Sequence, residues 1–199
     1  MSLIIGLIRH GETEWNAVGR IQGQTDISLN EAGIRQARAL AARLKAEDRV
    51  WDAVVSSDLK RARETARILA DALGIPLLPP DPRIRERSFG LAEGTTEEER
   101  LRRWGADWRS RDVGQESDDS VQKRGLAFIA DWQARSPEIR LLVVSHGSIL
   151  AVLLRALCSD LEDRRIGNMS LSILESAGSD WRVLLHNCSK HLDTLETRS

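Results

Sequence analysis

The sequence predicts an α/β fold in which helices cover both faces of a mostly parallel sheet. Two short apolar runs, residues 3–8 and 141–144, have the β-branched composition of strands buried on both faces. Segments with helical periodicity separate them, and such alternation is typical of a doubly wound sheet. Two final strands, 170–175 and 181–185, are joined by a short turn. We therefore expect a three-layer α/β/α sandwich with an antiparallel C-terminal edge.

The remaining elements follow in order along the chain. Further strands are expected at 51–56 and, very short, at 77–78, and residues 11–26 are expected to form a loop. Helices are predicted near 30–44, 59–73, 121–134 and 148–157. The charged segment 95–111 has helical propensity, and a continuous helix would place Trp104 and Trp108 on one face.

Length and composition favour one domain over residues 1–199, without internal repeats. Lysine and arginine total 29 against 30 acidic residues, so no chain-wide basic field exists and nucleic acid is not an expected partner. Two widely spaced cysteines are typical of a reducing compartment. No apolar stretch reaches membrane-spanning length, and the N-terminus lacks signal-peptide character. A cytoplasmic protein is the prediction.

Two histidines stand at the predicted carboxyl ends of strands, and each is followed by glycine. Ligands of open α/β sheets bind just outside these ends, so we expect His10 and His146 to converge there. A neutral imidazole is a competent nucleophile towards phosphorus, and Arg9 offers a fork of donors for phosphate oxygens. The alternative interpretation is an Arg–His pair that merely ends a strand, and a core histidine held by backbone.

Two further charged residues fit phosphate chemistry. Arg61 lies in the first turn of a predicted helix, where anions are favoured, whereas Arg63 must point elsewhere because positions two apart diverge. Glu86 stands in a predicted loop and could donate a proton to a leaving alcohol. An exposed charged helix and a solvated loop glutamate are the structural alternatives.

Five sequence blocks occur in the order found in one known family. The segments RHGETEWN, GRIQGQTDISLNEAG, SSDLKRARETA, RERSFGLAEG and VVSHG resemble those of the histidine phosphatase superfamily, also called the phosphoglycerate mutase-like family. The tail NMSLSILESAGSDWRVLLHNCSKHL is similar to that of its small phosphatase members. The resemblance covers nearly the whole chain. One departure is Ala92, where relatives often carry tryptophan.

The resemblance implies a role for each matching residue. His10 would be the nucleophile that becomes phosphohistidine, and Glu86 would be the proton donor. The implied phosphate pocket and substrate contacts are Arg9, Asn16, Gln22, Gly23, Arg61 and His146, and we add Gly147 at the start of the following helix. Two guanidinium groups and two imidazoles can stabilise a transferring phosphoryl group without a metal, so no metal or cofactor is expected.

The predicted function is a metal-independent phosphomonoester hydrolase acting on a small phosphorylated metabolite. A cofactor-dependent phosphoglycerate mutase is the competing enzyme. Mutases of the resembling family carry a longer insertion between the acid and the second histidine, whereas Glu86 and His146 are only 60 positions apart here, which favours the phosphatase. A non-catalytic phosphate-binding module is a third hypothesis, which the complete residue set disfavours. Segment 95–116 could form a lid that determines the substrate, with Arg102, Arg103 and Arg109 near a second anionic group. A homodimer is left open.

Overall fold

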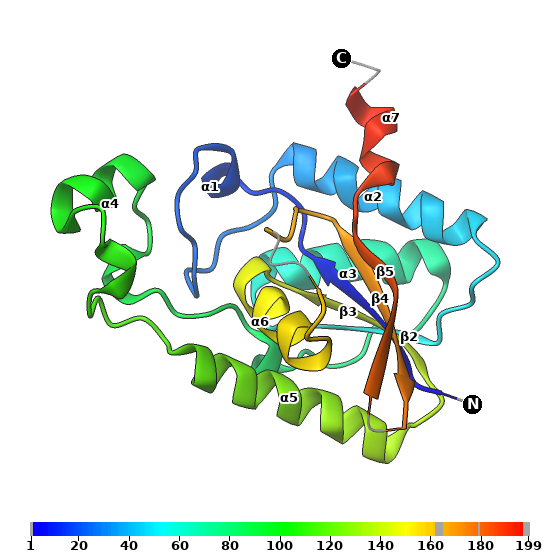
Figure 1. The fold of residues 1–199 in the computed structure, drawn as a ribbon. Helices are drawn as coiled ribbons and strands as arrows, with labels where there is room; N and C mark the ends of the chain where they lie inside the picture. The colour runs from blue at the N-terminus through cyan, green and yellow to red at the C-terminus, as the bar shows by residue number, and fades with distance from the viewer. Residues whose placement is uncertain (1, 162–164, 179, 197–199) are drawn as a thin grey trace.

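The computed structural model describes residues 2–161, 165–178 and 180–196. Its five strands form one sheet in the order β2-β3-β1-β4-β5 (Figure 1). Strand β3 pairs in parallel with both β1 and β2, whereas β4 pairs antiparallel with β1 and with β5. The strands are β1 Ile4–Arg9, β2 Ala53–Ser56, β3 Arg140–Ser145, β4 Leu171–Ala177 and β5 Asp180–Cys188.

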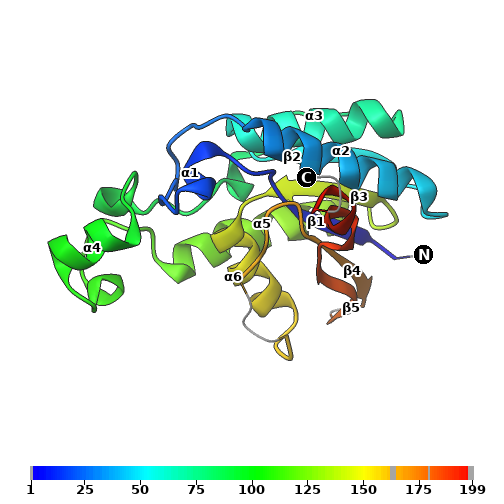
Figure 2. The ribbon, with the colours of Figure 1, turned by 90° about the horizontal axis from the view of Figure 1, so that it is seen from above.

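Helices cover both faces of this sheet, so the predicted α/β/α sandwich is confirmed. Helices α2 and α3 lie together on one face, and α5 and α6 lie on the other (Figure 2). The helices are α1 Glu14–Ala17, α2 Glu31–Ala46, α3 Lys60–Leu73, α4 Glu97–Trp104, α5 Asp118–Arg135, α6 Gly147–Leu157 and α7 Asp193–Glu196. Among the described residues, no helix is both long and apolar enough to cross a bilayer.

The buried strands divide their side chains between two cores, because successive strand residues point to opposite faces. Leu141 and Val143 of β3 pack with α5 and α6, whereas Leu142 and Val144 pack with α2 and α3. All four are fully buried, which explains why the strand is a continuous apolar run. Because β1 and β3 are parallel neighbours, His10 and His146 leave the sheet at the same edge.

Three segments differ from the sequence-based prediction. The expected loop 11–26 contains the short helix α1, whose N-cap Thr13 forms a capping box with Asn16. The expected strand at 77–78 reduces to one isolated bridge between Val54 and Leu77. The predicted helix 95–111 is interrupted at Gly105, which adopts a φ of 81° after α4 ends.

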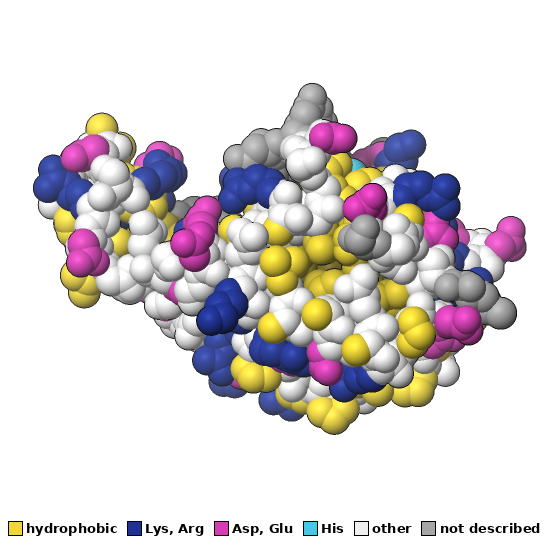
Figure 3. Space-filling view, turned by 60° about the horizontal axis from the view of Figure 1, so that its bottom comes forward, with side chains coloured by type: hydrophobic (Ala, Val, Ile, Leu, Met, Phe, Trp, Pro, Cys, Tyr) yellow, Lys and Arg dark blue, Asp and Glu magenta, His cyan; other side chains and the backbone are white. Residues whose placement is uncertain are grey.

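This interruption changes the surroundings of the two tryptophans. Trp108 lies in a separate 3-10 turn, Trp108–Ser110, and is buried with Ala92 and Val113. The guanidinium groups of Arg100 and Arg109 lie 4.9 and 4.5 Å from its ring centroid. The predicted shared helical face is wrong because α4 ends between the two tryptophans, although Trp104, partly buried, still packs against the cluster of Trp108. Helix α4 and the turn Trp108–Ser110 form a lobe, the α4 lobe, which stands out from the body of the protein (Figure 3).

Candidate active site

The two strand-end histidines meet at the carboxyl edge of the sheet. The ring centroids of His10 and His146 are 5.1 Å apart, and both side chains are buried. The backbone N–H of His10 donates to the carbonyl of Ser145 at 3.0 Å, which continues the β1–β3 ladder beyond the strand ends. The predicted convergence of the two histidines is therefore confirmed by the parallel pairing.

The contacts of His10 define which ring nitrogen carries the proton and which holds the lone pair. Its Nδ1 lies 2.6 Å from the carbonyl oxygen of Gly11, which can only accept, so Nδ1 carries the proton. The Nε–H of Arg61 donates to Nε2 of His10 at 3.2 Å. Nε2 therefore holds a lone pair, as attack on phosphorus requires.

Arg61 is held rigidly although it lies completely inside the protein. Its Nη1 and Nη2 donate to the carbonyls of Thr25 and Gly23 at 2.9 and 2.7 Å. Gly23 has a φ of +53°, which glycine adopts without strain, and a Cβ there would collide with the Glu93 carboxylate. Burial lowers the pKa of Arg61 to about 10, which leaves it charged at neutral pH.

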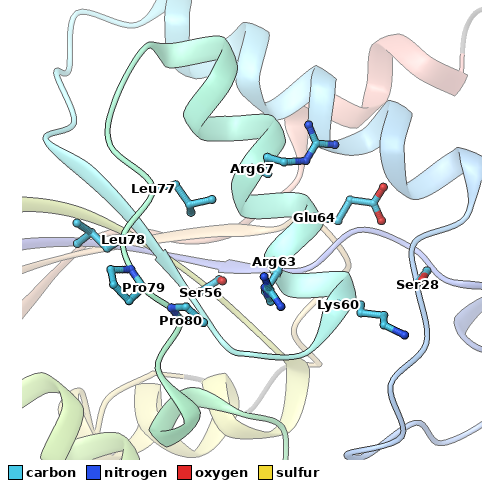
Figure 4. Close-up of a pocket in the computed structure, with 10 residues that line it drawn as sticks. All are labelled: Ser28, Ser56, Lys60, Arg63, Glu64, Arg67, Leu77, Leu78, Pro79 and Pro80. Carbon is cyan, nitrogen blue, oxygen red and sulfur yellow. The ribbon is translucent and has the colours of Figure 1, made fainter.

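Arg63 diverges from Arg61 as predicted and is exposed on the outer side of α3. There it borders a second cavity of about 630 Å³ between α3 and residues 77–80 (Figure 4). Two positions within one turn of α3 therefore place one guanidinium inside the protein and the other in solvent.

Arg9 and Arg61 give the two buried histidines a cationic, desolvated environment. The Nη1 of Arg9 donates to the carbonyl of Ile166 at 2.7 Å, while its buried Nε has no partner among the described residues. Burial lowers the pKa of Arg9 to about 10. Burial first, then the charges of Arg61 and Arg9, hold the pKa of His10 well below its usual value. A neutral imidazole therefore persists across the neutral range.

His146 lies against the ring of His10 and contacts the residue after β2. Its Nε2 lies 2.7 Å from the hydroxyl of Ser57, which follows β2. Its Nδ1 is buried and has no hydrogen-bond partner within the described ranges. Burial and the nearby Arg61 charge keep the pKa of His146 well below its usual value.

The carboxylate of Glu86 is anchored at the start of α6. Its Oε2 accepts from the backbone N–H of Ser148, and its Oε1 accepts from those of Ile149 and Arg87, all within 2.9–3.1 Å. The positive end of a helix dipole favours a carboxylate there. Glu86 is therefore a buried, ordered side chain and not the solvated loop residue of the alternative interpretation.

The predicted residues surround a polar cavity of about 930 Å³, a volume typical of small-molecule sites. Its wall includes Arg9, His10, Asn16, Gln22, Gly23, Arg61, Glu86 and Gly147. His146 lies against His10 behind this wall. The Oε1 of Gln22 is buried and has no partner in the described part of the chain, so it can accept from a substrate. Arg102 and Arg103 are exposed outside the cavity, whereas Arg109 borders it.

Asn168 is a site residue that the sequence analysis missed. Its Nδ2 donates to the carbonyl of His10 at 3.0 Å and to Oδ1 of Asn16 at 3.2 Å. The residue precedes β4, more than 150 positions from both partners. It is the first residue of the tail NMSLSIL that resembles the family, but that resemblance assigned no role to it. Only the antiparallel pairing of β4 with β1 brings it to the nucleophile.

Comparison with known proteins agrees with this geometry. Residues 5–189 match the histidine phosphatase superfamily (branch 1), and the chain belongs to this family. The uncharacterized phosphatase PhoE of Bacillus subtilis is 36% identical over 94% of this chain and 95% of its own. A metal-independent phosphoserine phosphatase of Arabidopsis thaliana is 32% identical, covering 96% and 84%. A probable phosphoglycerate mutase, GpmB of Yersinia pestis, is 38% identical, covering 90% and 87%.

The structure of a mycobacterial glucosyl-3-phosphoglycerate phosphatase has the same fold. It aligns with a TM-score of 0.81 at 30% identity, over 93% of this chain and 99% of that one. This protein is therefore a phosphatase, and members of its family act through a phosphohistidine intermediate. No three His, Cys, Asp or Glu side chains of the described residues are grouped to hold a metal ion.

Proposed function

We propose that this phosphatase hydrolyses the phosphomonoester of a small metabolite with His10 as its nucleophile. Nε2 of His10 attacks phosphorus, an N–P bond forms, and the ester P–O bond breaks. Glu86, in its acid form, gives its proton to the departing alkoxide oxygen. In the second step Glu86 takes a proton from water, the water oxygen attacks phosphorus, and the N–P bond breaks. Inorganic phosphate and neutral His10 result.

The orientation of Nε2 carries this proposal. Gly11 fixes the tautomer and Arg61 points at the lone pair, so the nucleophile is preorganised. Arg9 and Arg61 would bind phosphate oxygens as they gain charge, and Nδ1 of His146 would contact another. Asn16 and Gly147 would contribute from the cavity wall. No metal is required by this arrangement of charges.

We propose that the outer part of the cavity binds the alcohol portion of the substrate. Gln22 and Gly23 border it on one side, and Arg109 and Trp108 of the α4 lobe border it on another. Segment 95–116 would thus act as the lid that selects the ester. The single-domain organisation, the homodimer, the cytoplasmic location and the absence of a nucleic-acid partner stay predictions.

Phosphoglycerate mutase is the second candidate, favoured by the similarity to GpmB. Both activities share the phosphohistidine step and differ in whether water or a second hydroxyl accepts the phosphoryl group. With 3-phosphoglycerate, isomerisation that is stimulated by 2,3-bisphosphoglycerate and outpaces phosphate release would favour the mutase.

The mechanism is tested with a panel of phosphate esters in the presence of EDTA. We expect wild-type phosphate release to persist and His10→Ala to lose at least about 10³-fold, because no other nucleophile replaces the imidazole. Arg38→Gln, exposed on α2 and outside the cavity, is the control and should retain activity. Loss of wild-type activity in EDTA, or an active His10→Ala, would contradict the mechanism. Ligand affinity without phosphate release would indicate a binding module.

A further inference from the structure

Residues 165–169 form a segment, here called the clamp, that is hydrogen-bonded to the end of β1 next to His10. The backbone N–H of Met169 donates to the carbonyl of Arg9 at 3.0 Å, and the guanidinium of Arg9 donates to the carbonyl of Ile166. Met169 holds a φ of 54°, an uncommon conformation for a side chain of its size, and is fully buried. Such backbone strain persists only where the surrounding contacts enforce it.

Within this clamp, the amide group of Asn168 has one permitted orientation. Its nitrogen faces the carbonyl oxygen of His10, which accepts only, so the group pointing there is the NH₂. The second hydrogen of the same NH₂ points at Oδ1 of Asn16, 3.2 Å away. One side chain therefore joins the backbone of the nucleophile to a phosphate-pocket residue.

Asn16 is oriented in the same way by donors on its oxygen. The backbone N–H and the hydroxyl of Thr13 donate to Oδ1 of Asn16 at 3.3 and 3.2 Å, and Asn168 donates to the same oxygen. Asn16 lines the cavity, and with its oxygen occupied, its NH₂ is the group of this side chain left to donate to a ligand there. That group is the kind of donor a phosphate oxygen accepts from.

We propose that Asn168 is a positioning residue, which sets the separation between His10 and the donor NH₂ of Asn16. The inference rests on the proposed function, in which Asn16 binds the phosphoryl group that His10 attacks. A misplacement of this donor weakens phosphate binding even though Asn168 itself touches no substrate. The effect of changing Asn168 must therefore depend on Asn16.

A double-mutant cycle tests this dependence. Wild type, Asn16→Ala, Asn168→Ala and the double variant are compared for kcat and KM on p-nitrophenyl phosphate and for Kd of orthovanadate. We expect Asn168→Ala to lower kcat/KM and weaken vanadate binding about 10- to 100-fold, because the displaced Asn16 would lose its hydrogen bond to the charged phosphoryl group or vanadate. In the Asn16→Ala background the same change should cost less than about threefold. Equal losses in both backgrounds would overturn the proposal.

Asn187 provides the matched control, because it holds the same segment from the opposite side. Its side chain accepts from Gly167 at 3.1 Å and donates to Arg165 at 3.0 Å, without contacting His10 or Asn16. Its φ of 45° suits glycine, so Asn187→Gly removes both bonds without backbone strain. We expect activity within about threefold of wild type. A loss as large as that of Asn168→Ala would show a purely structural role.

Two further measurements keep the inference separate from folding and from the proposed function. If Asn168→Ala does not fold, Asn168→Ser retains one donor and should show an intermediate loss; wild-type values would overturn the proposal. Asn168→Asp places an acceptor against two oxygens, and its activity relative to wild type should rise as pH falls and the carboxyl takes up a proton. A folded wild type without turnover contradicts the proposed function, while the vanadate cycle still tests Asn168. A wild type that binds no vanadate overturns the inference.

Discussion

The Nε–H of Arg61 donates to Nε2 of His10 at 3.2 Å and joins the first turn of α3 to the end of β1. This contact has two consequences for the nucleophile. It orients the lone pair, and its positive charge helps to lower the pKa of the imidazole. In the proposed mechanism, a phosphate oxygen takes over the Arg61 donor and leaves Nε2 of His10 directed at phosphorus.

Replacing Arg61 should separate its charge from its geometry. We expect Arg61→Gln to raise the pKa of His10, so that the acid limb of the kcat/KM profile moves to higher pH. Arg61→Lys keeps the charge and should leave that limb nearly in place. Its kcat/KM should still fall about 10²-fold, because lysine lacks the planar fork of donors.

Profiles of kcat/KM between pH 4 and 9 on p-nitrophenyl phosphate measure both effects. Arg63→Gln, exposed on the same helix, is the control. Coinciding acid limbs for the Gln and Lys variants would contradict the electrostatic role.

Glu86→Gln should discriminate between substrates by their leaving groups. Alkyl phosphates need a protonated leaving oxygen, so we expect kcat to fall about 10²- to 10⁴-fold. For p-nitrophenyl phosphate, whose phenolate leaves without a proton, the loss should stay below about tenfold. Initial rates of phosphate release provide the measurement. Glu31→Gln, exposed on α2 and outside the cavity, should resemble wild type on both substrates, and equal losses of Glu86→Gln on the two substrates would argue against the acid role.

The buried histidines predict a loss of stability in mild acid. Burial holds the pKa values of His10 and His146 well below 6.5 and lowers that of His191 to about 4. As pH falls below 6.5, these groups bind protons only in the unfolded chain, so the free energy of unfolding decreases. The slope should approach about 1.4 kcal/mol per pH unit for each histidine.

Urea denaturation between pH 7 and 5 measures this slope, in a range where carboxylates contribute little. His10→Gln should reduce the slope by about 1.4 kcal/mol per pH unit, which is the contribution of one proton. A free energy of unfolding that stays constant from pH 7 to 5 would show that these histidines do not resist protonation in the folded state.

Much of the fold could be predicted because its signals are local. The apolar runs ending at Ile8 and Val144 mark strands buried on both faces, and parallel pairing then places the two histidines together. The motif order indicated Arg9, Arg61 and Glu86, which the structure brings to one cavity. The break at Gly105 was missed, because helical propensity on both sides outweighed a single glycine in the pattern.

The sequence by itself determined the layered sheet, the positions of His10 and His146 at strand ends, and the family to which the chain belongs. Only the tertiary structure decided which imidazole nitrogen of His10 holds the lone pair, how Glu86 is anchored, and that Asn168 connects the backbone of His10 to Asn16. The physical reason is the distance along the chain that separates the interacting residues. Strand and helix patterns are written in neighbouring residues, whereas hydrogen bonds across the site join groups that approach only when β1, α3, α6 and the segment before β4 have packed together.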